Sequence, residues 1–539
     1  MTGGRITGGA ARLLAATLLL AGCATAEMGS GSAGQAAGGA DSAANSAAAR
    51  RFEAVRHSPP ELRAFLYRMP KGADLHSHLT GAVYAETYLR LAAGAGLCFD
   101  VKAKALAAPT AQAPCGDAGS ARPAAAAVVA DGTLYPMALD ALSTRDALPV
   151  SGYSLHDQFF ATFGRFRAAT AATPATGGDL LAEVVDRAGR QGVRHVELMV
   201  SFGTGPVAGI GKALPWTPQA AADLSGTADR LVAAGLPALV PAARQEIDAA
   251  EARMRSVLGC GTPAARPGCA VSVRYLQQVS RTQGPGPVFA TTLFNALLQA
   301  QEPRVVGLNF VAPEDNPVAL DDYDLHMRMV AEAKRRLPGT NVALHAGELT
   351  LGLVPPERLR DHIRKAVEIA GAQRIGHGVD LMYEDDPEGL LRSMAGRKVA
   401  VEINLTSNDK ILGVAGRNHP FPLYRAAGVP TVLSTDDEGV SRIDLTNELQ
   451  RAVQEFGLGY ADLAGLARAS LEHSFLPGAS LWSAPGCIPA GLGGSREEPC
   501  RAIVGRSEKA RVQWALEEAL ARFDREMAAG MQSNTDGNQ

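Results

Sequence analysis

Eight short runs of β-forming residues alternate with longer helical stretches along most of this chain, and this alternation restricts its fold more than any other feature. Strands that are separated by helices form parallel sheets, because each return to the same edge needs a crossover segment. Eight such units favour a closed (β/α)₈ barrel, so we predict an α/β protein of that architecture. The predicted strands are Ala73–Leu79, Val193–Ser201, Val271–Ser280, Val305–Val311, Asn341–Glu348, Arg374–Val379, Val399–Thr406 and Pro430–Thr435.

The chain is longer than a bare barrel requires, so insertions are expected. A (β/α)₈ barrel takes ~250 residues, and this chain has 539. We assign the barrel to residues 51–531, with its largest insertion at about 90–192. Within it, the aromatic residues of Leu155–Phe163 recur at helical spacing, which predicts a helix packed over the barrel. Further helices are predicted at Leu181–Gln191, His326–Leu337, Pro356–Ala370 and Asp444–Phe456.

Composition and charge exclude some classes of protein. Apolar residues make up 46% of the chain, which is enough for a large core and excludes wholesale disorder. The formal net charge is only −3, and the sequence has no basic stripe or stacking motif. Nucleic-acid binding is therefore not expected. The oligomeric state is left open by the sequence.

The cysteines indicate an oxidising compartment. The chain has seven, and all but Cys23 form three pairs of near neighbours in the sequence. In an oxidising compartment such pairs become disulfides that staple loops. Proximity alone does not fix the pairing, and free or zinc-binding thiols are the alternative, although no CxxC motif is present. The predicted disulfides are Cys98–Cys115, Cys260–Cys269 and Cys487–Cys500.

The N-terminal segment has the layout of a secretory signal. Arg5 and Arg12 give it a weakly basic start, and its apolar run, Leu13–Gly22, is about half the ~20 residues of a membrane-spanning helix. Leu-Ala-Gly-Cys at residues 20–23 resembles a bacterial lipobox, in which the cysteine is lipidated and becomes the first residue. We expect a signal peptide at 1–22 and a lipid on Cys23. An ordinary cleaved signal with an incidental cysteine is the alternative.

The two ends of the chain are expected to lack a fold of their own. Residues 23–50 are mainly Ala, Gly and Ser, which predicts a flexible tether after the lipidated cysteine. The polar residues 532–539 predict a disordered tail. We expect the protein to be exported and anchored by its lipid to a bacterial membrane. The site of anchoring would be the outer membrane, facing the periplasm, or the cell surface. The residue after the cysteine is Ala24, whereas an aspartate at this position is associated with retention in the inner membrane. Ala24 therefore favours the outer membrane.

Histidines and acids gather where four of the predicted strands end. In a (β/α)₈ barrel these ends meet at one mouth, where active sites are built. Residues two apart in a strand share a face, so His76 and His78 on the first strand both point into the barrel. Each residue alone could be an ordinary satisfied polar group or a helix cap, but together they predict a metal site. The others are His345 and Glu348 on the fifth strand, His377 on the sixth, and Asp436 and Asp437 after the eighth.

These segments resemble the adenosine deaminase family of the amidohydrolase superfamily, whose members are metal-dependent TIM barrels. The resemblance covers about residues 65–475, and it is most specific in His-Ala-Gly-Glu at 345–348 and Thr-Asp-Asp at 435–437. Pro70–Leu79 and Gly376–Gly378 carry it as well. Dinuclear relatives have a modified lysine at the end of the fourth strand, and this chain has none there. A single-metal site therefore fits better.

The resemblance implies a zinc ion and two catalytic residues. Zinc would make a bound water acidic enough to act as a nucleophile near neutral pH. Glu348 would protonate the purine ring, and His377 would orient and deprotonate the water and stabilise developing charge. The implied ligands of the one zinc ion per chain are His76, His78, His345 and Asp436.

The resemblance also implies substrate contacts and supporting residues. The purine would meet Asp437 and the backbone N–H of Ala312, and the residues after the paired histidines, Thr80 and Gly81, would lie near the sugar. Ser407 is expected to support the catalytic histidine. On the second predicted strand, His195 and Glu197 are interpreted as structural residues that fill the barrel, with support of the site as the alternative. The aromatic helix at 155–163 would form an apolar lid above the sugar.

Two departures from the family pattern concern the substrate. Thr80 replaces an aspartate that contacts the 5′-hydroxyl in most adenosine deaminases, and Asn309 and Ala312 stand where Asp and Gly are usual. The leading hypothesis is hydrolysis of adenosine or 2′-deoxyadenosine to inosine and ammonia. The alternatives are a deaminase of 5′-modified adenosine or an adenine nucleotide, an amidohydrolase of amides or esters, and a catalytically silent surface binding protein.

Overall fold

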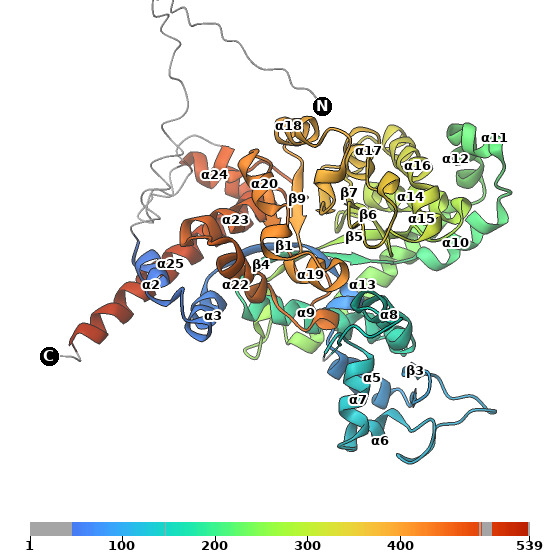
Figure 1. Ribbon diagram of the computed structural model, residues 1–539, viewed down its shortest axis with the longest axis horizontal. Coiled ribbons are helices and arrows are strands. Elements are labelled where there is room, and N and C mark those ends of the chain that lie inside the picture. The colour runs from blue at the N-terminus through green and yellow to red at the C-terminus, as the bar shows by residue number, and fades with distance from the viewer. Residues whose placement is uncertain (1–45, 146, 484–486, 488–497, 537–539) are drawn as a thin grey trace, which may run out of the picture.

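Eight parallel strands form a barrel with helices around it in the computed structural model, which describes residues 46–145, 147–483, 487 and 498–536 (Figure 1). The strands pair in two runs, β1-β4-β5-β6 and β10-β9-β8-β7, and every pairing within them is parallel. The fold is therefore the predicted (β/α)₈ barrel. Its strands are β1 (Lys71–His78), β4 (Val193–Val200), β5 (Ser272–Ser280), β6 (Val305–Val311), β7 (Ala343–Ala346), β8 (Arg374–His377), β9 (Ala400–Ile403) and β10 (Thr431–Leu433).

Isolated bridges join the two runs of strands into a closed barrel. Between β6 and β7, Leu308 pairs with Val342. Between β1 and the residues after β10, Ser77 pairs with Asp436. Asp436 N–H donates to His76 O at 2.8 Å, and Asp436 O accepts from His78 N–H at 3.1 Å. The peptide of Asp436 is thus held on both sides at the C-terminal end of β1.

All eight predicted strands are present, with differences at their ends. β9 stops at Ile403, because the predicted Leu405 and Thr406 begin helix α19 (Leu405–Leu412), where Thr406 N–H donates to Glu448 Oε2. β7 stops before Gly347, whose φ of +74° leaves the β region.

The predicted helices are present with shifted boundaries. The helix predicted over 356–370 divides into a 3₁₀ turn (Pro356–Arg358) and α17 (His362–Glu368). The segment with aromatic residues at helical spacing is α8 (Leu155–Thr170), which is therefore confirmed as a helix. The other predicted helices appear as α9 (Thr176–Arg190), α16 (Tyr323–Arg336) and α22 (Leu445–Phe456).

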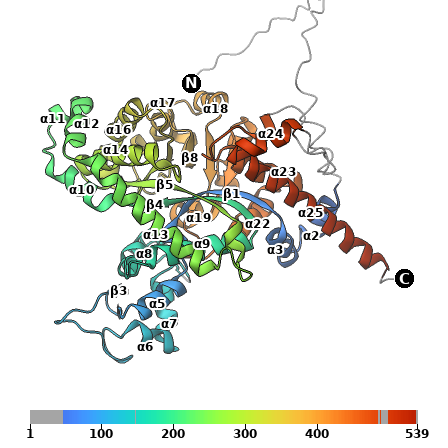
Figure 2. The same cartoon turned by 180° about the vertical axis from the view of Figure 1, so that it is seen from behind.

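Apolar helices cover the outside of the barrel. α14 (Pro285–Gln301) is apolar around most of its circumference, and twelve of its 17 residues are buried between β5 and β6 and the neighbouring helices. α9 packs on β4, and α13 (Val240–Leu258) packs outside α9 (Figure 2). α13 is amphipathic and buries one residue about every turn, such as Ile247 and Met254, which places it at the surface. These layers hold the strands in a fixed arrangement.

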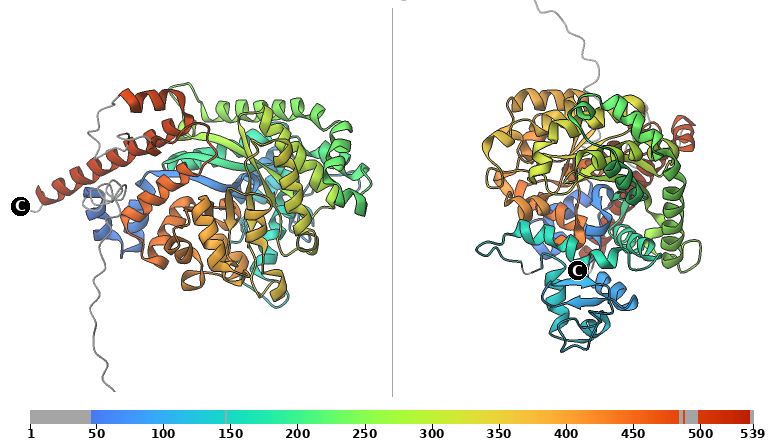
Figure 3. Two further views of the ribbon diagram at one scale, coloured as in Figure 1. Left: turned by 90° about the horizontal axis from the view of Figure 1, so that it is seen from above. Right: turned by 90° about the vertical axis from the view of Figure 1, so that its right-hand side faces the viewer.

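Both ends of the described chain are helical, which corrects two predictions. The tether predicted over 23–50 overlaps α2 (Ala47–Val55), whose first residues are buried beside α25 (Glu508–Asp536) (Figure 3). Ala48 N–H donates to Asp524 Oδ1 at 2.8 Å. The tail predicted from 532 also begins too early, because α25 continues to Asp536. Cys23, the predicted signal peptide and the rest of the tether lie outside the described residues.

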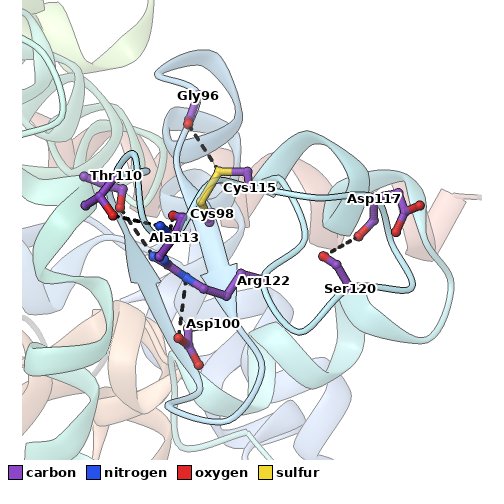
Figure 4. Close-up of a disulfide and its surroundings, with 10 residues drawn as sticks. Gly96, Cys98, Asp100, Thr110, Ala113, Cys115, Asp117, Ser120 and Arg122 are labelled. Carbon is purple, nitrogen blue, oxygen red and sulfur yellow. Dashed lines mark hydrogen bonds and ion pairs between the residues drawn. A yellow bond between two sulfur atoms is a disulfide. The ribbon is translucent and has the colours of Figure 1, made fainter.

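The largest insertion projects from one side of the barrel (Figure 3). It begins in α5 (Ala85–Gly94), and its hairpin of β2 and β3 was not predicted. Cys98 at the start of β2 is bonded to Cys115, and Arg122 pairs with Asp100 beside it (Figure 4). The elements of the insertion are β2 (Cys98–Asp100), β3 (Ala105–Ala107), α6 (Ala125–Ala130), α7 (Leu134–Ala141) and α8.

All three predicted disulfides are present. Besides Cys98–Cys115, the structure contains Cys260–Cys269 and Cys487–Cys500. Each bond joins cysteines that are close in the sequence, so each staples a local loop. Within the described part of the chain, none of the helices combines the length and the apolar character that crossing a membrane would need.

Removing the first disulfide should destabilise the protein by about 3 kcal/mol, because the bond restricts the unfolded chain between its cysteines. The double substitution Cys98→Ser/Cys115→Ser tests this by urea unfolding. The matched control is Cys260→Ser/Cys269→Ser, whose shorter loop predicts a loss of about 2.6 kcal/mol. A larger loss for the control than for Cys98→Ser/Cys115→Ser would contradict the loop-length explanation.

Candidate active site

Three histidines and one aspartate converge at the C-terminal mouth of the barrel, as predicted. His76, His78, His345 and Asp436 each offer a ligand atom, and these atoms lie within 4.8 Å of one another. The Nε2 atoms of His76 and His78 are 3.1 and 3.2 Å from His345 Nε2, and 3.4 and 3.3 Å from Asp436 Oδ1. Lone pairs converge in this way around a cation, and this donor set is one that zinc binds.

The barrel itself creates this convergence. His76 and His78 lie two apart on β1 and face the same side, and His345 comes from β7 across the barrel. Asp436 adopts φ +58°, an uncommon left-handed conformation for a residue other than glycine. The two backbone hydrogen bonds to β1 hold Asp436 in that conformation, so closing the barrel also places the carboxylate.

A buried chain of charged side chains orients His76. His76 Nδ1 lies 2.6 Å from Glu402 Oε2, and Arg374 Nε donates to Glu402 Oε1 at 2.5 Å. Arg374 Nη2 is in turn 2.7 Å from Glu197 Oε2, and His195 Nε2 lies 3.3 Å from Glu197 Oε1. His195 and Glu197 are thus interior residues, as interpreted, and they connect to the metal ligand through two residues that were not predicted.

The charges of this network fit a divalent cation. Burial alone would raise the pKa of Glu197, but the charge of Arg374 and the hydrogen bonds from His195 and Arg374 together lower that pKa to about 2. Glu197 and Glu402 share one buried guanidinium, that of Arg374, and the third buried carboxylate, Asp436, lies among the histidines. Three carboxylates thus stand against one arginine in this network. Uncompensated buried charge is costly, and a dication at the ligand cluster would neutralise it.

His345 has a neutral partner instead of an acid. Its Nδ1 donates to Asn309 Oδ1 at 2.9 Å, and its backbone N–H donates to the same oxygen at 3.0 Å. Burial and the neighbouring histidines hold the pKa of His345 well below its usual value, so its Nε2 keeps the lone pair that a metal requires. Asn309 was noted in the sequence only as a departure from the family pattern; the structure makes it the orienting partner of a ligand.

Glu348 and His377 lie beside the metal ligands. Glu348 Oε1 is 3.5 Å from His377 Nε2, and both form a second compact group with Asp436. Burial and the charge of Asp436 raise the pKa of Glu348 well above its usual value, which suits a proton donor at neutral pH. His377 has φ +71°, and burial lowers its pKa to about 3, so its ring is neutral.

Arg281 and Glu314 restrain the backbone next to Glu348 and Ala312, and neither residue was predicted from the sequence. Glu314 accepts the N–H of Gly347 at 3.2 Å and of Glu348 at 2.9 Å. Arg281 Nε donates to Ala312 O at 2.7 Å, which restrains Ala312 in its left-handed conformation of φ +82°. Both follow strand ends, β5 and β6, which is the only sequence signal that could have revealed them.

A cavity of about 340 Å³ opens above the metal ligands. Three aromatic residues of α8, Phe159, Phe160 and Phe163, form its apolar wall, in agreement with the predicted lid. The polar side of the cavity contains residues that were predicted to contact the substrate and the metal. Among the described residues that line the cavity, none is Lys or Arg. The other lining residues are His78, Thr80, Gln278, Val311, Ala312, Pro313, His345, Glu348, Asp436 and Asp437.

Two predicted contacts differ in the structure. Ser407 Oγ donates to Asp436 Oδ2 at 2.6 Å, so it supports a metal ligand and not His377. Gly81 packs against Asp437 outside the cavity wall, and a Cβ there would lie only 1.4 Å from Asp437 Oδ1. In both cases the neighbour is an aspartate that follows β10, which lies far away in the sequence from Ser407 or Gly81.

A (β/α)₈ barrel with three histidines and an aspartate at its mouth has the arrangement in which barrel proteins hold a catalytic metal ion. The family model of adenosine deaminase matches residues 237–480. An adenosine deaminase of Shewanella loihica is 32% identical over 181 residues, which is 33% of this chain and 49% of that protein. The chain thus spans about half the length of the curated relatives it matches. Residues 237–480 therefore resemble the adenosine deaminase family, in agreement with the resemblance found in the sequence.

Solved structures show the same fold. The Arabidopsis protein ADAL complexed with GMP superposes with a TM-score of 0.52 at 18% identity, over 85% of this chain and 98% of that one. An amidohydrolase of Burkholderia ambifaria with bound zinc gives a TM-score of 0.50 at 18% identity, over 85% of this chain and 94% of that one. At these identities the similarity concerns the barrel.

Glu402→Gln should weaken metal binding about 10- to 100-fold, because a carboxylate on the far nitrogen of a histidine ligand orients the ring and raises its basicity. Competition with a chromogenic chelator measures the affinity. Glu448→Gln is the matched control, since Glu448 is also buried but accepts from Thr406 and touches no ligand. Equal losses in the two variants would show that Glu402 acts only through stability.

Proposed function

We propose that this protein is a zinc-dependent deaminase that hydrolyses a purine nucleoside, adenosine or 2′-deoxyadenosine, to inosine and ammonia. The observation that carries the proposal is the position of Glu348. This protonatable carboxyl lines the cavity, and its Oε1 is 3.5 Å from His377 Nε2, within the group that also contains Asp436. Deamination needs a proton donor for the ring and a hydrolytic centre on one side of the base, and this arrangement supplies both.

Each residue of the site has a distinct role in the proposed reaction. A zinc ion held by the three histidines and Asp436 would lower the pKa of water and so supply the nucleophile. Glu348 holds a proton toward a ring nitrogen, and His377 faces the oxygen that attacks the adjacent carbon. Burial and the charge of Asp436 raise the pKa of Asp437, which therefore donates to an imidazole nitrogen of the purine. The Phe residues of α8 exclude water from the sugar side.

The cavity favours an uncharged substrate. A 5′-phosphate would meet no cation among the described lining residues, and it would share the cavity with Glu348, Asp436 and Asp437. Thr80 removes a negative charge that relatives have there, so 5′-modified adenosines and adenine nucleotides form the second candidate class. The similar Arabidopsis structure is a complex with GMP, so nucleotides are included among the substrates to be tested.

Glu348→Gln should lower kcat for adenosine about 10²- to 10⁴-fold, the range that general acids contribute. Ammonia release by the zinc-loaded protein measures it, with the metal content determined in parallel. Glu384→Gln is the control, because Glu384 is buried but its partners, the backbone of residues 363 and 364 and the Arg364 side chain, lie outside the cavity lining. A zinc-loaded wild type that turns over no adenosine analogue would favour a silent binding protein.

Adenosine and 5′-deoxyadenosine should both be deaminated with a kcat/KM at least about 100-fold above that of AMP. The reason is that moving a charged phosphate from water into a cavity without a cationic partner costs more than ~3 kcal/mol of free energy. Parallel assays of the three compounds at one zinc concentration measure the ratio. A preference for AMP would establish the nucleotide alternative instead.

The location is a separate proposal. The apolar run before Cys23 and the resemblance of residues 20–23 to a lipobox support export and a lipid anchor at a bacterial membrane. The disulfides support an oxidising compartment. Metabolic labelling with palmitate, compared between the wild type and Cys23→Ala, tests the anchor. Equal labelling of both would leave Cys23 as an incidental residue of an ordinary signal.

A further inference from the structure

A chain of buried hydrogen bonds ends on His377. His377 Nδ1 lies 2.9 Å from Asn408 Nδ2, and Asn408 Oδ1 lies 3.0 Å from His419 Nε2. Beyond His419 the chain reaches the backbone, because Phe421 N–H points at His419 Nδ1 from 3.1 Å. All three side chains are at most 3% exposed, so water does not compete for these contacts. Neither Asn408 nor His419 was predicted from the sequence.

The direction of every hydrogen bond in this chain follows from its last member. A backbone N–H is always a donor, so His419 Nδ1 must accept and the hydrogen of His419 lies on Nε2. That hydrogen is donated to Asn408 Oδ1, which orients the amide and directs Asn408 Nδ2 as a donor to His377 Nδ1. Burial lowers the pKa of His419 to about 4, in agreement with a neutral ring. Neutral His377 then carries its hydrogen on Nε2.

The Nε2–H group of His377 faces the active site without a partner. Among the described residues no acceptor completes a hydrogen bond with it, and Glu348 Oε1 is 3.5 Å away. A buried unpaired N–H is costly, so it marks the place where an oxygen atom is expected during the reaction. The opposite tautomer would present a lone pair there and would leave the amide hydrogen of Asn408 facing another hydrogen.

We propose that Asn408 and His419 are positioning residues that lock His377 in the tautomer with hydrogen on Nε2, so that His377 is a hydrogen-bond donor to the attacking oxygen. The proposal rests on the deaminase function proposed above. It changes the role expected for His377, which orients the oxygen and stabilises its charge but does not take its proton in the resting enzyme. The single geometric cause is the backbone N–H of Phe421, which sets the direction of the whole chain.

The tautomer can be measured directly on the zinc-loaded protein labelled with ¹⁵N-histidine. We expect the His377 Nε2 resonance in the range of a protonated ring nitrogen and Nδ1 in the range of an unprotonated one. The signals are assigned by their loss in His377→Gln. The reverse pattern in the wild type would overturn the proposal. This readout does not require turnover, so it tests the tautomer even if the deaminase function fails.

Asn408→Asp should reverse the tautomer. A carboxylate accepts from Nδ1–H, which leaves Nε2 without its hydrogen, and kcat for adenosine should fall at least about 100-fold at unchanged zinc content. Asn341→Asp is the control, since Asn341 also bridges two partners, Val306 O and Gln373 Nε2, but lies before β7 at the other end of the barrel. A kcat within twofold of the wild type in Asn408→Asp would overturn the proposal.

A second pair of variants decides the question if Asn408→Asp does not fold. His419→Gln keeps an N–H donor for Asn408, whereas His419→Leu removes it and leaves the amide free to turn. We expect the Gln variant to retain most of the kcat and the Leu variant to lose about tenfold, with two sets of His377 signals. Equal kcat values in both variants would overturn the proposal. An inactive wild type with the expected tautomer would instead count against the deaminase function.

Discussion

The site depends on a short seam, the backbone pairing of β1 with Asp436 after β10 that closes the barrel. One residue, Asp436, donates its N–H to His76 O and accepts from His78 N–H through its carbonyl oxygen, and His76 and His78 belong to the same ligand group. The same contacts hold Asp436 at φ +58° and aim its carboxylate at the histidines. Closing the barrel and assembling the ligands are therefore one event, and strain in this peptide persists because both sides of the seam restrain it.

Around this seam the protein uses charge and neutral hydrogen bonds for different tasks. The ligand His76 is oriented by Glu402 and, through Arg374, by Glu197, which supplies the negative charge that a dication balances. His377 is oriented by an amide and a neutral histidine, which add no charge. The first arrangement favours metal binding, and the second keeps a neutral donor in place next to Glu348.

Much of the fold and the ligand set could be predicted because they depend on local patterns. Strand and helix periodicity located all eight strands, and alternation along β1 placed His76 and His78 on one face. The errors occurred where distant segments decide a local structure. Thr406 begins a helix because Glu448 accepts its N–H, and residues 47–49 are helical because α25 buries them. Ser407 was assigned to the wrong partner for the same reason.

The sequence by itself determined the barrel, the four metal-binding side chains, Glu348, and the pairing of cysteines that lie close together. These follow from periodicity and short spacing, which a chain carries wherever it folds. Only the tertiary structure decided that Asn408 and His419 face His377, that Glu402 reaches His76, and that the cavity wall offers no described cation to a phosphate. Those relations join residues from different strands and loops, and their hydrogen-bond directions exist only once the barrel has closed.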